Sequence, residues 1–169
     1  MSVLREGELE FDFSAASEAE LFDAQTKGDP FPHGWQPVDF LITETDRRLL
    51  LEVKDPFHTK ALPKEKRKYL AGLTAKEMVA NLGPKARDSY CYLHLMARDD
   101  RPFDYCVLLG GEAGDLESAL LSDLNTRLAA RLKKEAATPW ARRYIRNCLV
   151  VDLAGWAKLF PNYPVRRLP

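Results

Sequence analysis

Two apolar runs on either side of a short charged turn constrain the fold of this chain most strongly. Residues 38–42 and 49–53 flank the charged segment 44–48, a pattern that predicts a β-hairpin. A turn centred between Thr45 and Asp46 puts three apolar pairs on one face: Val38 with Val53, Phe40 with Leu51, and Ile42 with Leu49. A shift of one residue would turn every side chain to the other face, so this pattern fixes the register.

The opposite face of the same hairpin carries charge. The register that pairs Leu41 with Leu50 also sets Asp39 opposite Glu52, and Lys54 follows two residues later on the same face. Like charges about 5 Å apart destabilise a sheet unless one is protonated, paired with an amine, or bound to a cation. One interpretation is a structural ion cluster. The other is a site for a hard divalent cation, which we favour because paired buried carboxylates tend to mark function.

The motif Asp39…Glu52-Val53-Lys54 resembles the PD-(D/E)XK signature of the restriction-endonuclease-like nuclease superfamily, with Pro37 displaced by one place. The resemblance covers roughly residues 15–60. It implies a phosphodiesterase that acts on DNA and depends on Mg²⁺ or Mn²⁺. The implied metal ligands are Asp39, Glu52 and the backbone carbonyl of Val53, and Lys54 would act on the attacking water or on the phosphate.

The segment Glu18-Ala-Glu-Leu21 is predicted to lie in a helix that ends at Lys27-Gly28. It resembles the first-helix segment of archaeal Holliday-junction resolvases, which implies that Glu18 is an accessory acid of the site. Glu20 is the alternative, but its spacing from Ser17 fits a capping box and gives it a structural role. Glu18 lies on the helix face that would pack on the sheet, and we therefore favour Glu18.

The formal net charge is zero, but the charges are unevenly distributed. Residues 1–46 hold eleven acidic and two basic side chains, and the densest basic cluster follows the motif. We predict that this cluster holds a DNA backbone, since sequence-independent affinity comes mainly from Lys and Arg contacts. Its members are Lys60, Lys64, Lys66, Arg67 and Lys68. The alternative is a solvated loop and helix start.

A second candidate for nucleic-acid binding is the segment from Trp140 to Arg146, where aromatic residues alternate with arginines as in stacking platforms. On a helix, Trp140 and Tyr144 would share one face. Ordinary packing of that face is therefore the favoured interpretation.

The rest of the chain predicts a single α/β domain over residues 1–169: a mixed sheet flanked by helices on both faces, as in the restriction-endonuclease-like nucleases. Beyond the hairpin we expect helices over 74–97, broken or kinked at Gly83-Pro84, and over 116–134, and strands over 103–109 and 148–153. The resemblance also implies a strand before Asp39. Either 28–35 or the alternating segment 9–13 could supply it.

No apolar run is long enough to span a membrane, and the first residues lack a signal-peptide pattern, so we expect a cytoplasmic protein. The three cysteines predict buried thiols. The favoured function is a DNA-cleaving phosphodiesterase, for which symmetric cutting of a duplex would favour a homodimer. The alternative is a catalytically inactive nuclease-like subunit that binds nucleic acid or another protein.

Overall fold

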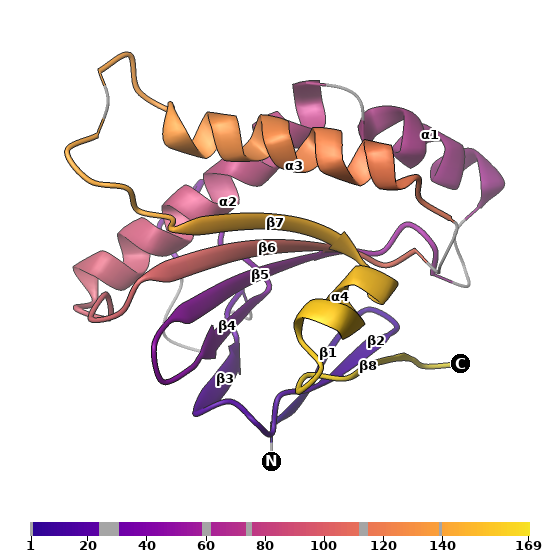
Figure 1. Ribbon diagram of the computed structural model, residues 1–169, viewed down its shortest axis with the longest axis horizontal. Helices are drawn as coiled ribbons and strands as arrows, with labels where there is room; N and C mark the ends of the chain where they lie inside the picture. Colours follow the sequence, from indigo (N-terminus) through magenta and orange to yellow (C-terminus); the bar gives the residue numbers. More distant parts are fainter. Residues whose placement is uncertain (1, 24–30, 59–61, 74–75, 112–114, 139) are drawn as a thin grey trace.

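The computed structural model describes residues 2–23, 31–58, 62–73, 76–111, 115–138 and 140–169. Within these ranges the chain forms a mixed five-stranded sheet, a three-stranded antiparallel sheet and four helices (Figure 1). The larger sheet has the order β3 (Glu18–Leu21), β4 (Phe40–Thr43), β5 (Arg48–Lys54), β6 (Phe103–Leu109) and β7 (Asn147–Asp152). Strands β3, β4 and β5 are antiparallel neighbours, whereas β5, β6 and β7 run parallel. The predicted α/β class is confirmed.

Three helices cover one face of the larger sheet (Figure 1). Helices α1 (Pro63–Leu73) and α2 (Lys76–Leu95) connect β5 to β6, and α3 (Ser118–Lys133) connects β6 to β7. Both crossovers step in the same direction across the sheet, and crossovers of one hand then lie on the same face. The core beneath them includes Leu41, Leu50, Leu82, Leu93, Tyr105, Val107, Leu124 and Leu128.

The opposite face is covered mainly by the smaller sheet and by one short helix, so helices do lie on both faces as expected, but unequally. That sheet consists of β1 (Val3–Glu6), β2 (Leu9–Asp12) and β8 (Val165–Arg167), and it is joined there by the short helix α4 (Leu153–Leu159) (Figure 1). An aromatic core fills the space between the two sheets and α4: Phe11, Phe13, Phe40, Trp156, Phe160 and Tyr163. Because β5 to β7 never reverse their order, no further crossover helix lies on this face.

Several local predictions had different outcomes. The alternating segment 9–13 does form a strand, but in the smaller sheet, and β3 is the strand beside β4. Helix α2 continues past Pro84 without a break. Residues 140–146 form no helix and Trp140 is 53% exposed, so the favoured packing of Trp140 with Tyr144 on one helix face was wrong. None of the helices in the described ranges is long and apolar enough to cross a membrane.

Candidate functional site

The hairpin of β4 and β5 has the register that the sequence predicts: Phe40 pairs with Leu51, Leu41 with Leu50, and Ile42 with Leu49. Asp39 precedes β4 directly, and Glu52 lies near the end of β5. Both carboxylates are buried, with 5% of Asp39 and 0% of Glu52 exposed. The hydrophobic pattern therefore brings two carboxylates to one end of the hairpin, as expected.

The regular ladder between the two strands ends at this point. The Val53 amide donates to Asp39 Oδ2 at 2.6 Å, and the Val38 amide donates to Ser89 Oγ of α2 at 3.0 Å. In a continued antiparallel ladder the Val38 amide would donate to the Val53 carbonyl. That carbonyl is therefore released from the β4–β5 ladder, beside Asp39. Where the ladder ends, the side chain of Val38 packs in the helix-covered core, whereas Phe40 and Val53 pack in the core on the other face. The predicted place of Val38 on the face of Phe40 was therefore wrong.

Glu52 is the most deeply buried carboxylate of the cluster. Its Oε1 forms ion pairs with Lys54 Nζ at 2.6 Å and Lys85 Nζ at 2.9 Å, whereas Oε2 forms none; neither oxygen has a hydrogen-bond partner of good geometry among the described residues. Burial, and next the charge of Asp39, raise the pKa of Glu52 to about 7, although both lysines oppose this. Burial alone would lower the pKa of Lys54, but the attraction to Glu52 outweighs it and raises the pKa.

Lys85 is a member of this cluster that the sequence analysis missed. It extends from α2, and its Nζ also donates to the Pro37 carbonyl at 3.1 Å. The available signal was its position on the helix, three residues after Leu82 and four before Ser89, both fully buried. Lys85 thus connects α2 to β5 and to the segment that carries Asp39.

Two further carboxylates approach Asp39, and neither was predicted. Burial and then the charge of Asp39 raise the pKa of Asp23, and a hydrogen bond between the two carboxyl groups adds to the effect. Burial, followed by the charges of Asp39 and Asp23, likewise raises the pKa of Glu6, which ends β1. The cluster therefore gathers acidic groups from both sheets.

Glu18 lies apart from this cluster. Residues 18–21 form strand β3 instead of the predicted helix, and Glu18 pairs with Thr43 at the end of β4 that is far from Asp39. Its side chain is exposed, and Glu20 forms an ion pair with Arg98. The edge of β4 needs a hydrogen-bonding partner, and this requirement outweighs the local capping signal. The first-helix assignment is therefore wrong, and Asp23, not Glu18, is the acid that reaches Asp39.

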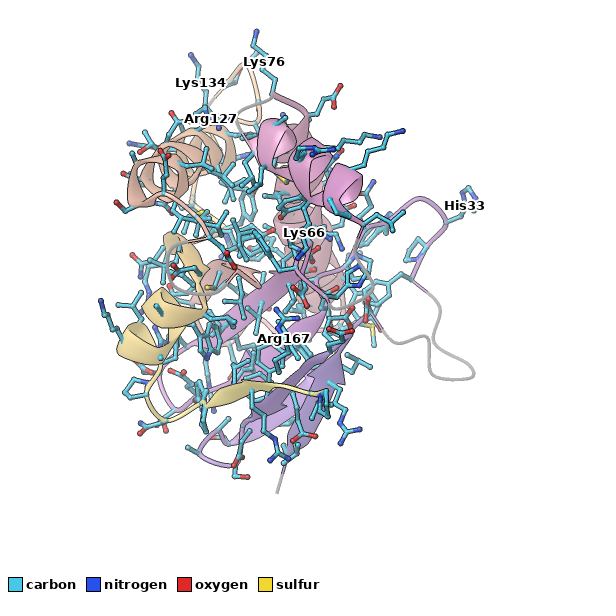
Figure 2. All side chains as sticks on the ribbon, turned by 90° about the vertical axis from the view of Figure 1, so that its right-hand side faces the viewer. His33, Lys66, Lys76, Arg127, Lys134 and Arg167 are labelled. Atoms are coloured by element: carbon cyan, nitrogen blue, oxygen red, sulfur yellow. The ribbon has the colours of Figure 1, made fainter. Side chains whose placement is uncertain are left out.

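The basic segment after the motif lies close to the cluster on α1. Lys64, Arg67 and Lys68 are exposed, and Lys66 Nζ lies 5.6 Å from the centroid of the Phe57 ring; Lys60 is outside the described residues. Figure 2 shows Lys66 at the end of the molecule where Arg167 also lies. Arg167 binds both carboxylate oxygens of Asp55, the residue that follows Lys54.

The side of α1 that packs on the sheet reaches the cluster through the side chain of Tyr69. Burial and then the charge of Glu52 raise the pKa of Tyr69, and its hydroxyl has no hydrogen-bond partner among the described residues. Helix α1 therefore packs beside the buried carboxylates through Tyr69, while Lys64, Arg67 and Lys68 face the solvent.

The donor set fits Mg²⁺ better than a metal that needs a complete protein cage. In the described part of the chain, no group of three or more His, Cys, Asp or Glu side chains is arranged to hold a metal ion. Asp39, Glu52 and the released Val53 carbonyl remain as oxygen donors. Mg²⁺ typically takes one or two protein carboxylates and completes its shell with waters and phosphate oxygens.

Comparisons with protein-family models, with curated proteins and with solved structures find no match for this chain.

Proposed function

We propose that this protein is a metal-dependent phosphodiesterase of the endonuclease type that acts on DNA. The observation that carries the proposal is the wholly buried Glu52, whose Oε2 has no partner among the described residues, next to Asp39 and the released Val53 carbonyl. Mg²⁺ or Mn²⁺ would be held by these three groups. A metal bound here would activate water and neutralise charge on the phosphorus centre.

The residues of the chain supply the remaining requirements of phosphodiester hydrolysis. A water oxygen forms a bond to phosphorus and gives up a proton to solvent, the ester P–O bond breaks, and the leaving oxygen takes a proton from solvent, so that no net proton is gained or lost. The side chain of Lys54 is 35% exposed, so its ammonium can face a phosphate while it remains next to Glu52. A cation in that position stabilises the charge that develops on the phosphate. The exposed lysines and arginine of α1 would hold the neighbouring backbone phosphates.

The arrangement of the strands is compatible with the resemblance. A three-stranded antiparallel meander carries the motif, and parallel strands follow it through helical crossovers. We accordingly propose that the larger sheet is of the restriction-endonuclease-like type. The carboxylate-bearing ends of β4 and β5 would then form its active edge.

A second candidate is a nuclease-like nucleic-acid-binding or protein-interaction subunit without catalysis. One observation favours it: Lys54 and Lys85 both lie on Glu52 Oε1, so the cluster can approach neutrality without a metal. A purely structural ion cluster of this kind would bind no divalent cation. The two candidates therefore differ in metal binding as well as in cleavage.

The deciding experiment is a cleavage assay with Mg²⁺ and with Mn²⁺ on duplex, branched and single-stranded DNA. We expect cleavage by the wild type and by Lys158→Ala, which removes an exposed lysine of α4, and none by Lys54→Ala. Calorimetry should detect Mg²⁺ binding that the double change Asp39→Asn and Glu52→Gln abolishes. If the folded wild type neither binds the metal nor cleaves any of these substrates, the proposal is wrong and the inactive subunit is the better description.

A further inference from the structure

Two adjoining cavities lie at the other end of the larger sheet, beside the start of β6. The first, which we call the basic cavity, has a volume of about 460 Å³, and its lining includes Arg101, Arg142, Arg143 and Arg146. The second, the aromatic cavity, has a volume of about 310 Å³, and its lining includes Tyr90, Trp140, Arg142 and Tyr144. Arg142 lines both cavities, so a ligand can occupy the two together.

The basic cavity retains positive charge that the protein does not neutralise. Four arginines and two aspartates line it, so the lining carries net positive charge. Asp100 forms ion pairs with Arg48 and Arg101, and Asp99 lies 2.6 Å from His94 and feels the charge of Arg142 as well. Arg142 and Arg143 are exposed, and neither forms an ion pair within the described ranges. Two guanidinium groups side by side in the chain are therefore available to an anionic ligand. Guanidinium forks match phosphate oxygens in geometry as well as in charge.

The aromatic cavity supplies a different chemistry. Trp140 is 53% exposed, whereas Tyr144, which lines the same cavity, is buried and its hydroxyl donates to Glu135 at 2.9 Å. Tyr90 contacts Tyr144 with ring centroids 5.5 Å apart. An exposed indole in the same cavity as two tyrosine rings offers a stacking surface for a flat ring. Its exposure follows from the loop conformation of residues 140–146, since a helix would have packed it against Tyr144.

We infer that these adjoining cavities bind single-stranded nucleic acid, with a base stacked on Trp140 and phosphates held by Arg142 and Arg143. A single strand fits better than a duplex, because a base must leave its stack to reach an aromatic side chain. The surface is separate from the carboxylate cluster. The basic cavity adjoins Phe103 at the start of β6, whereas Glu52 pairs with Val107 four residues further on, so the two regions lie about 13 Å apart along the strand.

The test is fluorescence anisotropy of a labelled thymidine 12-mer with the full chain, in EDTA so that no cleavage occurs. We expect Trp140→Ala to weaken binding roughly tenfold, as the loss of one stacked base does. The double change Arg142→Ala and Arg143→Ala should weaken binding and lower the slope of log K against log salt by about 1.4, because each phosphate contact on a single strand contributes about 0.7. The matched control is Lys133→Ala with Lys134→Ala, which removes two exposed charges that line neither the basic nor the aromatic cavity.

Three outcomes would overturn the inference. The first is a control double variant that weakens binding as much as the arginine double variant does. The second is an equal or higher affinity for duplex DNA of the same length. The third is wild-type affinity in Trp140→Ala, with circular dichroism showing that the variant is folded. Because the assay contains no metal, a failure of the proposed phosphodiesterase activity leaves these results unaffected, and the reverse also holds.

Discussion

Glu52→Gln is expected to stabilise the metal-free protein at pH 8. Glutamine has the shape of the protonated carboxyl group, and Glu52 is wholly buried beside Asp39, Lys54 and Lys85. Burial raises the pKa of Glu52 from an ordinary value of 4.5 to about 7. A difference of about 2.5 pKa units at about 1.4 kcal/mol per unit corresponds to about 3 kcal/mol of free energy of unfolding.

The direction of the effect follows from the protons bound by each state. Below about pH 4.5 Glu52 is neutral in both the folded and the unfolded chain, so it causes no penalty. Between about pH 4.5 and 7 the unfolded chain releases a proton that the folded protein retains, and the wild type loses stability. The glutamine variant lacks this loss. The difference between the two proteins should therefore grow across this window and level off above pH 7.

The assay is urea unfolding of both proteins in EDTA at several pH values between 4 and 8. We expect nearly equal free energies of unfolding at the acidic end and an advantage of about 3 kcal/mol for Glu52→Gln at pH 8. Glu18→Gln is the matched control, since Glu18 is exposed in β3 and its replacement should change stability by less than about 0.5 kcal/mol. If Glu52→Gln is instead less stable than the wild type at pH 8, the two lysines compensate the buried charge fully and the reasoning is refuted.

Three further changes test other parts of the structure. Lys85→Met should cost about 1–3 kcal/mol at pH 8 and less at pH 5, where Glu52 is protonated, as measured by urea unfolding; equal losses at both pH values would contradict the ion pair. Asp104→Asn should cost about 3 kcal/mol at pH 7 in chemical denaturation, because two arginines lose a buried partner. Burial tends to raise the pKa of Asp104, but its hydrogen bonds with the arginines lower the pKa overall. The stability that Asp104 contributes should therefore be lost as the pH falls below about 4, and a stability that does not change with pH in that range would contradict this prediction. Gly110→Ala should lower stability by about 1–3 kcal/mol in thermal unfolding, since a Cβ there would lie 2.4 Å from Asp55 Oδ1 and 2.7 Å from its Cγ; an unchanged melting temperature would show that the Asp55 side chain moves freely.

The first helix shows where sequence reasoning failed. Residues 17–20 carry a capping pattern, yet 18–21 form an edge strand of the sheet. The capping signal is local, whereas the open edge of β4 offers a full set of backbone hydrogen bonds that only the assembled sheet presents. The alternation of Glu18, Ala19, Glu20 and Leu21 was visible in the sequence and is the period of a strand.

Trp140 illustrates the same limit in a loop. Its spacing from Tyr144 suits one face of a helix, but residues 140–146 are irregular and Trp140 is exposed. The buried Tyr144 packs near Tyr90, and Arg146 binds Asp104. These contacts involve residues far away in the chain, and spacing along the chain gives no information about them.

The sequence by itself determined the hairpin, its register and the meeting of Asp39, Glu52 and Lys54, because two apolar runs around a short charged turn have one alignment that sets apolar residues opposite each other along both runs. Only the tertiary structure decided the rest of the cluster. Lys85 reaches Glu52 from α2, and Asp23 reaches Asp39 from the segment after β3, through packing of elements that are distant in sequence. The register of a hairpin depends on neighbours a few residues away, whereas the depth of Glu52 and its raised pKa depend on how the whole sheet is covered.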